Sequence, residues 1–149
     1  GMALAKAFEV SGLAIWLGQL MTTFGGLPLI LLLFVLVTAV NFLTEITSNL
    51  ATTAMLLPVL APLAFEVGVH PFGLMVAAAV AASCAYMLPV ATPPNAVVFG
   101  SGYLRIPDMV SKGIVLNLFS ILLITIMVYF LLPVLWDIDL TKFPKALLP

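Results

Sequence analysis

Charged side chains are scarce in this sequence: only 7% of its 149 residues are Asp, Glu, Lys or Arg, whereas 64% are hydrophobic. An ordinary soluble domain has about 25% charged residues. So few charges cannot cover a surface that faces water, and the composition therefore excludes a water-soluble globular domain. The five basic and six acidic residues leave a net charge of −1 and no basic surface for nucleic acid, so we expect no nucleic-acid partner.

Paired cysteines and clustered catalytic groups are also missing. Cys84 is the only cysteine, so an intrachain disulfide is impossible, and its place in an alanine-rich apolar run favours a packing role. No nucleophile, base and orienting group lie together, and no glycine-rich phosphate loop is present. Glu45 is the only acidic residue within the apolar region. We therefore predict that the chain is not an enzyme.

Long apolar runs are what the sequence has in abundance. Residues 10–44, 72–104 and 113–136 contain no Asp, Glu, Lys or Arg. Because ~20 apolar residues in a helix cross the hydrocarbon core of a bilayer, each run is long enough to enter or span a membrane. The runs lack the alternation of membrane β-strands, which favours helices over a barrel. The predicted fold class is all-α and integral to the membrane, with lipid around it.

Glycine, proline and polar residues divide these runs into membrane elements. The stretch Gly25-Gly26-Leu27-Pro28 ends the first element, Ser48-Asn49 joins two arms of the second, and Thr92-Pro93-Pro94-Asn95 interrupts the third. The prediction is a helix over residues 3–24, a re-entrant helical hairpin over 28–65, a broken helix over 72–100, a last transmembrane helix over 108–136 and a polar tail over 137–149.

The hairpin is predicted from a change of character within the apolar environment. The first arm begins at Pro28 and is apolar until Asn41, where the polar stretch NFLTEITSN begins. The second arm, residues 50–65, contains Pro58 and Pro62 and is short for a full crossing. Two such arms with a polar junction predict a tip near mid-membrane, with both arms returning to one side.

Polar side chains of this hairpin follow helical spacing. Their intervals place Asn41, Thr44, Glu45, Ser48 and Thr52 on one helical face. A carboxylate inside a membrane is costly and usually faces a bundle interior or an aqueous cavity, so Glu45 is a candidate site or support residue. The same stripe also fits interhelical hydrogen bonding, and the spacing alone leaves both interpretations open.

Two adjacent prolines predict a break in the third element. Pro93 and Pro94 remove two backbone donors and block helical pairing. A break at membrane depth is tolerated within protein or beside a water-filled cavity, where freed carbonyl oxygens can bind a hard cation such as sodium. Nearby helix N-termini can accept a carboxylate, and many secondary transporters build their sites from broken helices. A simple proline kink is the alternative.

Basic residues indicate an orientation in the membrane. Lys6, Arg105 and Lys112 fall on one side if the first helix crosses, the hairpin returns and the last two elements cross. Cytoplasmic loops favour Lys and Arg, so we expect that side to be cytoplasmic.

Two stretches, NFLTEITSNLATTAMLLPVLAPLA and YMLPVATPPNAVVFGSG, resemble the divalent anion/sodium symporter family, which carries dicarboxylates, citrate or sulfate with sodium. The similarity runs through Trp136 and corresponds to the last third of a full transporter. It implies two inverted repeats, each with a re-entrant hairpin bearing a Ser-Asn-Thr motif and an opposed broken helix, of which this chain holds the second. It also implies the remaining N-terminal part as a partner, a homodimer and the bacterial inner membrane.

The resemblance implies a role for each residue at these two constellations. Ser48 and Asn49 would lie at the hairpin tip, with the Asn49 side chain facing both substrate and sodium. The implied substrate-binding residues are Ser48, Asn49, Leu50, Thr92 and Pro93. The implied sodium ligands are the Asn49 side chain and the carbonyl oxygens of Thr44, Thr47 and Ala91.

Leu50 departs from the family pattern, which usually has Thr at that position. A desolvated substrate oxygen without its hydroxyl partner loses roughly 1–3 kcal/mol, which changes affinity by about ten- to a hundredfold. Thr52 or Thr53 could compensate only if the geometry of the tip shifts.

These features together predict part of a sodium-coupled secondary transporter for small di- or tricarboxylates, or sulfate, that works by alternating access. Sodium is the expected bound ion, and a small anion is the expected substrate. The alternative is a non-transporting membrane scaffold or assembly subunit whose polar face bonds partner helices. Because one half of a paired site cannot close around a substrate, we expect these residues alone to be inactive.

Overall fold

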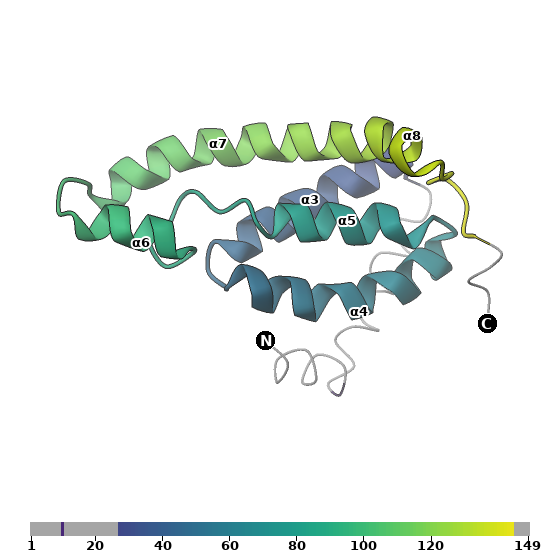
Figure 1. The fold of residues 1–149 in the computed structure, drawn as a ribbon, viewed down its shortest axis with the longest axis horizontal. Helices are drawn as coiled ribbons and strands as arrows, with labels where there is room; N and C mark the ends of the chain where they lie inside the picture. The colour runs from purple at the N-terminus through teal and green to yellow at the C-terminus, as the bar shows by residue number, and fades with distance from the viewer. Residues whose placement is uncertain (1–9, 11–26, 145–149) are drawn as a thin grey trace.

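The computed structural model describes Val10 and residues 27–144, which form helices joined by turns. Apart from Val10, the helix predicted for residues 3–24 lies outside the described residues, as do residues 145–149 of the predicted tail. An all-helical fold is confirmed for the described part of the chain. Its elements are α3 (Leu29–Thr44), α4 (Asn49–Val67), α5 (Pro71–Ala81), α6 (Pro93–Gly100), α7 (Ile106–Ile126), the π-helical turn η1 (Met127–Leu131) and α8 (Leu132–Trp136) (Figure 1).

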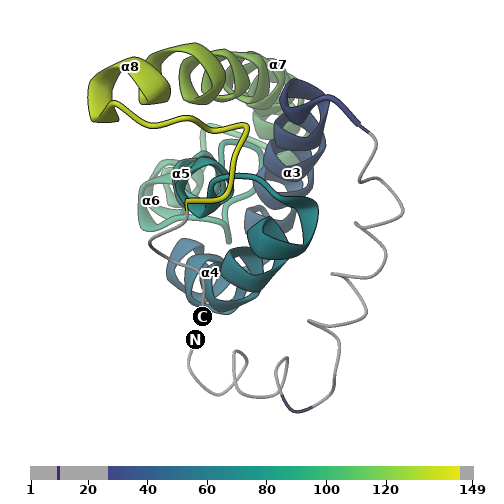
Figure 2. The same ribbon diagram turned by 90° about the vertical axis from the view of Figure 1, so that its right-hand side faces the viewer.

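Helix α5 lies at the centre of the bundle. It packs against α3, α4 and α7, and the view along the long axis shows it between them (Figure 2). Most of its buried residues are small, namely Gly73, Ala77, Ala78 and Ala81, and Leu74 is buried among them. Small side chains let helix backbones approach closely, which is a main source of packing between membrane helices. The alanine-rich run of the sequence thus becomes the core.

Helices α3 and α4 form a hairpin with a tight turn at residues 45–48. Ser48 has an extended backbone and caps α4, because its Oγ accepts the N–H of Ala51 at 3.1 Å. At its other end α4 stops at Gly68, whose φ of 78° lies in the left-handed region that favours glycine.

Both arms of the hairpin reach the tail of the chain at the end opposite the turn. Leu29, the first residue of α3, lines the same cavity as Leu140. Phe65, near the end of α4, packs edge to face against Phe143 with 5.2 Å between the ring centroids. The turn between α3 and α4 points away from α8 and this tail (Figure 1).

Helix α4 is 19 residues long and exceeds the arm predicted from the sequence, because it continues past Phe65 to Val67. Among the described helices, α4 and the continuous helix from Ile106 to Trp136 are long and apolar enough to cross a membrane. The length of α4 alone therefore does not distinguish a re-entrant arm from a full crossing. Pro58 and Pro62 lie within α4 without ending it.

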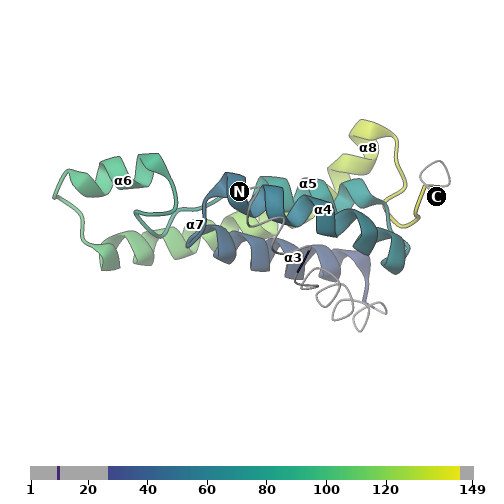
Figure 3. The same ribbon diagram turned by 90° about the horizontal axis from the view of Figure 1, so that it is seen from below.

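A non-helical stretch, residues 82–92, separates α5 from α6, and we call it the unwound segment. Helix α6 begins with Pro93 and Pro94 in its first turn. Thr92 caps this helix from an extended backbone, since its Oγ1 accepts the N–H of Asn95 at 3.4 Å. Helix α6 lies beside the first turns of α7, beyond the hairpin turn (Figure 3).

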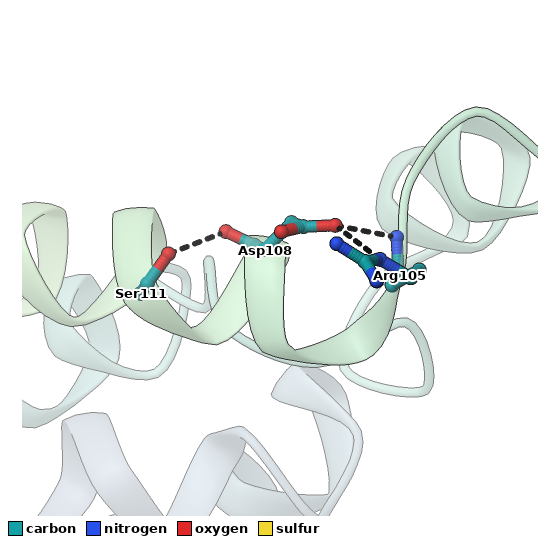
Figure 4. Close-up of polar contacts among 3 residues, drawn as sticks. All are labelled: Arg105, Asp108 and Ser111. Atoms are coloured by element: carbon teal, nitrogen blue, oxygen red, sulfur yellow. Dashed lines mark hydrogen bonds and ion pairs between the residues drawn. The ribbon is translucent and has the colours of Figure 1, made fainter.

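Helices α7 and α8, with η1 between them, form one continuous helix of 31 residues, which is ~46 Å long at 1.5 Å per residue. Asp108 caps its start: the Oδ2 atom accepts the backbone N–H of Arg105 at 3.2 Å and pairs with its Nε at 3.3 Å (Figure 4). Ser111 Oγ donates to the Asp108 carbonyl at 3.0 Å. The turn η1 lies just before Pro133, whose missing N–H interrupts the regular ladder.

His70 starts α5 and joins it to the tail. Its Nδ1 accepts the N–H of Phe72 at 3.2 Å, and its backbone N–H donates to the Leu140 carbonyl at 3.1 Å. Burial lowers the pKa of His70, although the nearby Asp139 carboxylate raises it, and a neutral ring suits this acceptor role. The contact with Lys142, at 2.8 Å, holds the pKa of Asp139 well below its usual value.

Gly68→Ala is expected to lower the free energy of unfolding by about 1 kcal/mol, because a residue with a Cβ is strained in the left-handed region. No atom of the described residues lies within 4 Å of the added Cβ, so the expected loss comes from backbone strain. Gly100→Ala is the matched control, since it also meets no atom within 4 Å and lacks the positive φ. Unfolding of the purified protein in detergent measures both, and equal effects would contradict the strain argument.

Candidate functional site

The carboxylate of Glu45 joins the hairpin turn to the unwound segment and to α7. Its Oε1 accepts the backbone N–H of Tyr86 at 2.8 Å and that of Met87 at 3.0 Å. Its Oε2 accepts those of Met87 and Leu88, each at 3.1 Å. Asn117 Nδ2, from α7, donates to Oε1 at 2.8 Å. One side chain therefore connects three segments that are far apart in the sequence.

The Glu45 side chain is only 3% exposed. Taking a carboxylate out of water is costly unless its oxygens accept good hydrogen bonds. In the part of the chain that the structure describes, every hydrogen-bond partner of Glu45 is an N–H donor, and three of them are backbone groups that the helix break leaves without helical acceptors. Of the two interpretations that the spacing leaves open, these bonds favour support: Glu45 holds the unwound segment in place.

Helix α7 contributes two residues that the sequence pattern did not single out. Asn117 is fully buried, and Gly113 lies one turn before it. A Cβ on Gly113 would lie 2.5 Å from the Tyr86 carbonyl oxygen and 2.7 Å from Met87 Cα, so only glycine fits against this backbone. The signal that could have revealed this face is the spacing of Gly113, Asn117 and Ser120 in an otherwise apolar helix.

Asn41 ties α3 to the unwound segment, since its Nδ2 donates to the Cys84 carbonyl at 2.8 Å. The Oδ1 atoms of Asn41 and Asn117 are buried and accept no hydrogen bond from the described residues. Reversing either amide would place its oxygen against another oxygen, Cys84 O or Glu45 Oε1. Hydrogen-bond chemistry therefore sets the orientation of both side chains.

Threonine hydroxyls brace the hairpin turn. Thr44 Oγ1 lies 2.8 Å from both Asn49 Oδ1 and the Ala82 carbonyl oxygen, so it links the two arms to the start of the unwound segment. The hydroxyls of Thr47 and Thr52 bond each other across the turn. The half-buried Asn49 side chain is thus oriented by Thr44.

The predicted polar stripe does not form one continuous helical face. Helix α3 ends at Thr44, and the chain turns before α4 begins. Asn41 and Thr44 are buried on α3 and Thr52 is buried on α4, whereas Ser48 is exposed between the two helices. The spacing argument is valid within a helix and wrong across the turn.

Asn95 folds the unwound segment back on itself. Its Nδ2 donates to the carbonyl oxygens of Ala85 and Leu88, both at 3.1 Å. The Leu88 carbonyl also accepts the N–H of Ala91 at 3.2 Å. The turn that carries Ala91 is therefore tied to the stretch that Glu45 holds.

Several backbone carbonyl oxygens in the hairpin turn and the unwound segment accept no hydrogen bond from the described residues. Within the described residues, no hydrogen bond is made to the carbonyl oxygens of Thr44, Thr47 and Ala91, the three that the resemblance implies as sodium ligands. Oxygen ligands of this kind suit hard cations. No three His, Cys, Asp and Glu side chains gather as a metal site in the same residues.

The N-terminus of α6 offers few donors to an anion. Pro93 and Pro94 have no N–H, and the N–H of Asn95 is bonded to the Thr92 hydroxyl. The expectation that unpaired amides of the broken helix accept a carboxylate is therefore wrong for the first turn of α6.

The N-terminus of α4 has free donors instead. The N–H groups of Asn49 and Leu50 make no hydrogen bond to any residue that the structure describes. They lie at the positive end of the helix dipole, where an anion is stabilised. The hairpin turn therefore offers free amides that the first turn of α6 lacks.

The side chain of Leu50 is 79% exposed. Neighbouring hydroxyls are engaged within the hairpin, because Thr52 Oγ1 donates to the Ser48 carbonyl at 3.1 Å and Thr53 Oγ1 to the Asn49 carbonyl at 2.9 Å. Neither threonine replaces the hydroxyl that Leu50 lacks.

Comparison with known proteins decides the family. Residues 1–137 match the family model described as the sodium:sulfate symporter transmembrane region. The chain belongs to this family. It is the divalent anion/sodium symporter family that the two motifs resemble, so that prediction is confirmed.

Two relatives in this family are sodium-dependent dicarboxylate transporters. The chain is 53% identical over 142 residues to the one from Staphylococcus saprophyticus and 51% identical to the one from Staphylococcus aureus. Each match covers 95% of this chain and 27% of the relative, so the chain spans about a quarter of the length of these curated proteins.

Family membership places the described helices in an integral membrane protein, because the matched region is a transmembrane region. The family consists of transporters rather than enzymes, as predicted from the missing catalytic groups.

Glu45→Gln is expected to lower the free energy of unfolding by about 2 kcal/mol, because the amide keeps one acceptor oxygen but turns an NH₂ group toward backbone donors. The control is Glu66→Gln on the exposed end of α4, which should change the free energy of unfolding by less than about 0.5 kcal/mol. Unfolding in detergent compares the two. A Glu45 effect no larger than that of Glu66 would show that these hydrogen bonds do not support the fold.

Proposed function

We propose that this chain is the C-terminal portion of a sodium-coupled transporter of small di- or tricarboxylates, or sulfate, and supplies one half of its substrate and sodium site. The observation that carries the proposal is the hairpin turn, where free amides and free carbonyl oxygens lie beside the unwound segment that Glu45 holds. The names of the relatives favour dicarboxylates and sodium as the transported pair.

The position of Asn117 supports a hairpin tip at membrane depth. Asn117 is 11 residues from Ile106 and 19 from Trp136 on the continuous helix, which is ~16 Å and ~28 Å at 1.5 Å per residue. Its bond to Glu45 brings the tip to the same level. The charge-free run of this helix begins at Gly113, so Asn117 and the tip lie about one turn inside the apolar stretch that enters the hydrocarbon core.

We propose on this basis that α3 and α4 are the arms of a re-entrant hairpin. Both arms reach the tail end of the molecule, whereas α6 and the first turns of α7 extend past the tip on the opposite side (Figures 1 and 3). A hairpin that crossed fully would reach the level of these elements. Polar backbone at such a depth is tolerated where it borders protein or a water-filled cavity.

Sodium in this proposal binds between the turn and the unwound segment. Its ligands are the carbonyl oxygens of Thr44, Thr47 and Ala91 and the side chain of Asn49. The unbonded state of the three carbonyls supports this assignment. The bonds of Asn95 and Glu45 support it further, because they set the path of the chain up to Ala91.

A substrate carboxylate in this proposal lies at the start of α4. It accepts hydrogen bonds from the Ser48 hydroxyl, the Asn49 side chain and the free amide of Leu50, with Thr92 and Pro93 at its border. Leu50 then contributes through its backbone, and its apolar side chain takes the place of the hydroxyl that the family usually presents. We expect this difference to affect which anion is preferred rather than whether an anion binds.

The remaining N-terminal part of the transporter supplies the opposing half-site, and alternating access moves the joined site between the two membrane faces. Bound sodium offsets the charge of the anion. We further propose a homodimer in the bacterial inner membrane. Membership of a transporter family favours this function over a non-transporting scaffold, although buried polar bonds would serve either.

Asn49→Ala in the full-length protein is expected to abolish sodium-dependent uptake, because it removes a ligand that substrate and sodium share. Uptake of radiolabelled dicarboxylate into proteoliposomes measures this. Thr38→Ala is the matched control on α3, since the Thr38 hydroxyl only bonds back to the Phe34 carbonyl. Unchanged uptake by the Asn49 variant would remove the tip from the site.

Sodium is expected to raise the unfolding temperature of the full-length protein, and a transported carboxylate should raise it further only when sodium is present, because a ligand that binds the folded state stabilises it. A panel of succinate, citrate and sulfate with sodium or with potassium tests this. Stabilisation that is equal in potassium would contradict sodium coupling.

A further inference from the structure

We propose that the last transmembrane helix positions the unwound segment through Gly113 and Asn117, and that this contact sets the affinity for sodium. Gly113 acts through the backbone of Tyr86 and Met87, and Asn117 acts through the Glu45 carboxylate. The proposal rests on the proposed function only for its sodium readout, because the contact itself is a feature of the fold.

Gly113 sets how closely α7 approaches the unwound segment. A Cβ at this position would meet the Tyr86 carbonyl oxygen at 2.5 Å and the Met87 Cα at 2.7 Å. Both are backbone atoms, so no side-chain rotation can relieve the contact, and either α7 or the segment must move. A Cβ at Gly100, in contrast, would meet no atom of the described residues within 4 Å.

Asn117, one turn further along α7, acts on the same stretch through Glu45. Its Nδ2 donates to Glu45 Oε1, the atom that also accepts the N–H groups of Tyr86 and Met87. The amide thus completes the set of donors around the carboxylate and holds it against the segment. The Tyr86–Met87 backbone therefore donates to Glu45 and also packs closely against Gly113.

The effect of this contact reaches the proposed sodium ligand through two hydrogen bonds. Leu88 donates its N–H to Glu45 Oε2 and accepts the N–H of Ala91 and the Nδ2 of Asn95 at its carbonyl. A displacement of residues 86–88 therefore displaces the turn that carries the Ala91 carbonyl. Cation sites depend on ligand positions, so a shifted carbonyl weakens binding.

The test uses Gly113→Ala and Asn117→Leu in the full-length protein. Hydrogen exchange of the amides of residues 86–88 should become at least about tenfold faster in both variants, and the sodium concentration for half-maximal uptake should rise about tenfold, with a smaller change in the maximal rate. Asn117→Gln keeps an amide donor and should recover part of the loss. The controls are Gly100→Ala and Leu118→Ala, an exposed neighbour on α7.

If Gly113→Ala does not fold, Asn117→Leu decides the question. Wild-type exchange and wild-type sodium dependence in a folded Asn117→Leu variant would overturn the positioning role. A wild-type protein that shows no sodium-dependent uptake would overturn the proposed function, whereas the exchange measurement would still decide whether α7 positions the segment.

Discussion

The buried carboxylate of Glu45 is the interaction on which the rest of this structure depends. A helix that breaks inside a membrane exposes backbone donors that neither lipid nor a regular helix can satisfy. Glu45 accepts three of them, from residues 86–88, and Asn117 orients it from α7. The hydrogen bonds between them therefore reduce both the cost of burying the carboxylate and the cost of leaving these backbone donors unpaired. The hairpin turn and the unwound segment can therefore lie side by side with free polar groups.

Local chemistry explains why part of this arrangement could be predicted from the sequence. Pro93 and Pro94 cannot continue a helix from the preceding residues, so these two residues alone predict the break. Ser48 is a strong N-cap residue at the junction of two apolar arms, and it indicates where α4 begins. The near absence of charge over long runs indicated membrane helices. Each of these inferences uses residues close together in the chain.

The other features of the candidate site depend mainly on contacts between residues that are distant in the sequence, and local sequence patterns do not predict such contacts. Asn117 is 72 residues from Glu45, and its role follows only from the packing of α7 against the hairpin. In the sequence, Gly113 is not distinguished from other glycines of membrane helices. Its role follows from its close approach to the backbone of Tyr86. The prediction that Asn41 to Thr52 share one helical face is wrong because periodicity assumes an unbroken helix, and the chain turns between α3 and α4. The expected free amides of α6 are missing for a local reason instead, since Pro93 and Pro94 carry no N–H and the Thr92 cap engages that of Asn95.

The central claim is that the α3–α4 turn lies inside the bilayer against an unwound segment held by Glu45. The most direct test is an experimental structure of the full-length protein in a lipid nanodisc containing sodium. We expect Asn49 within the lipid-chain layer and the Glu45 carboxylate within hydrogen-bond distance of the amides of residues 86–88. A turn outside that layer, or a Glu45 side chain directed away from the segment, would contradict it.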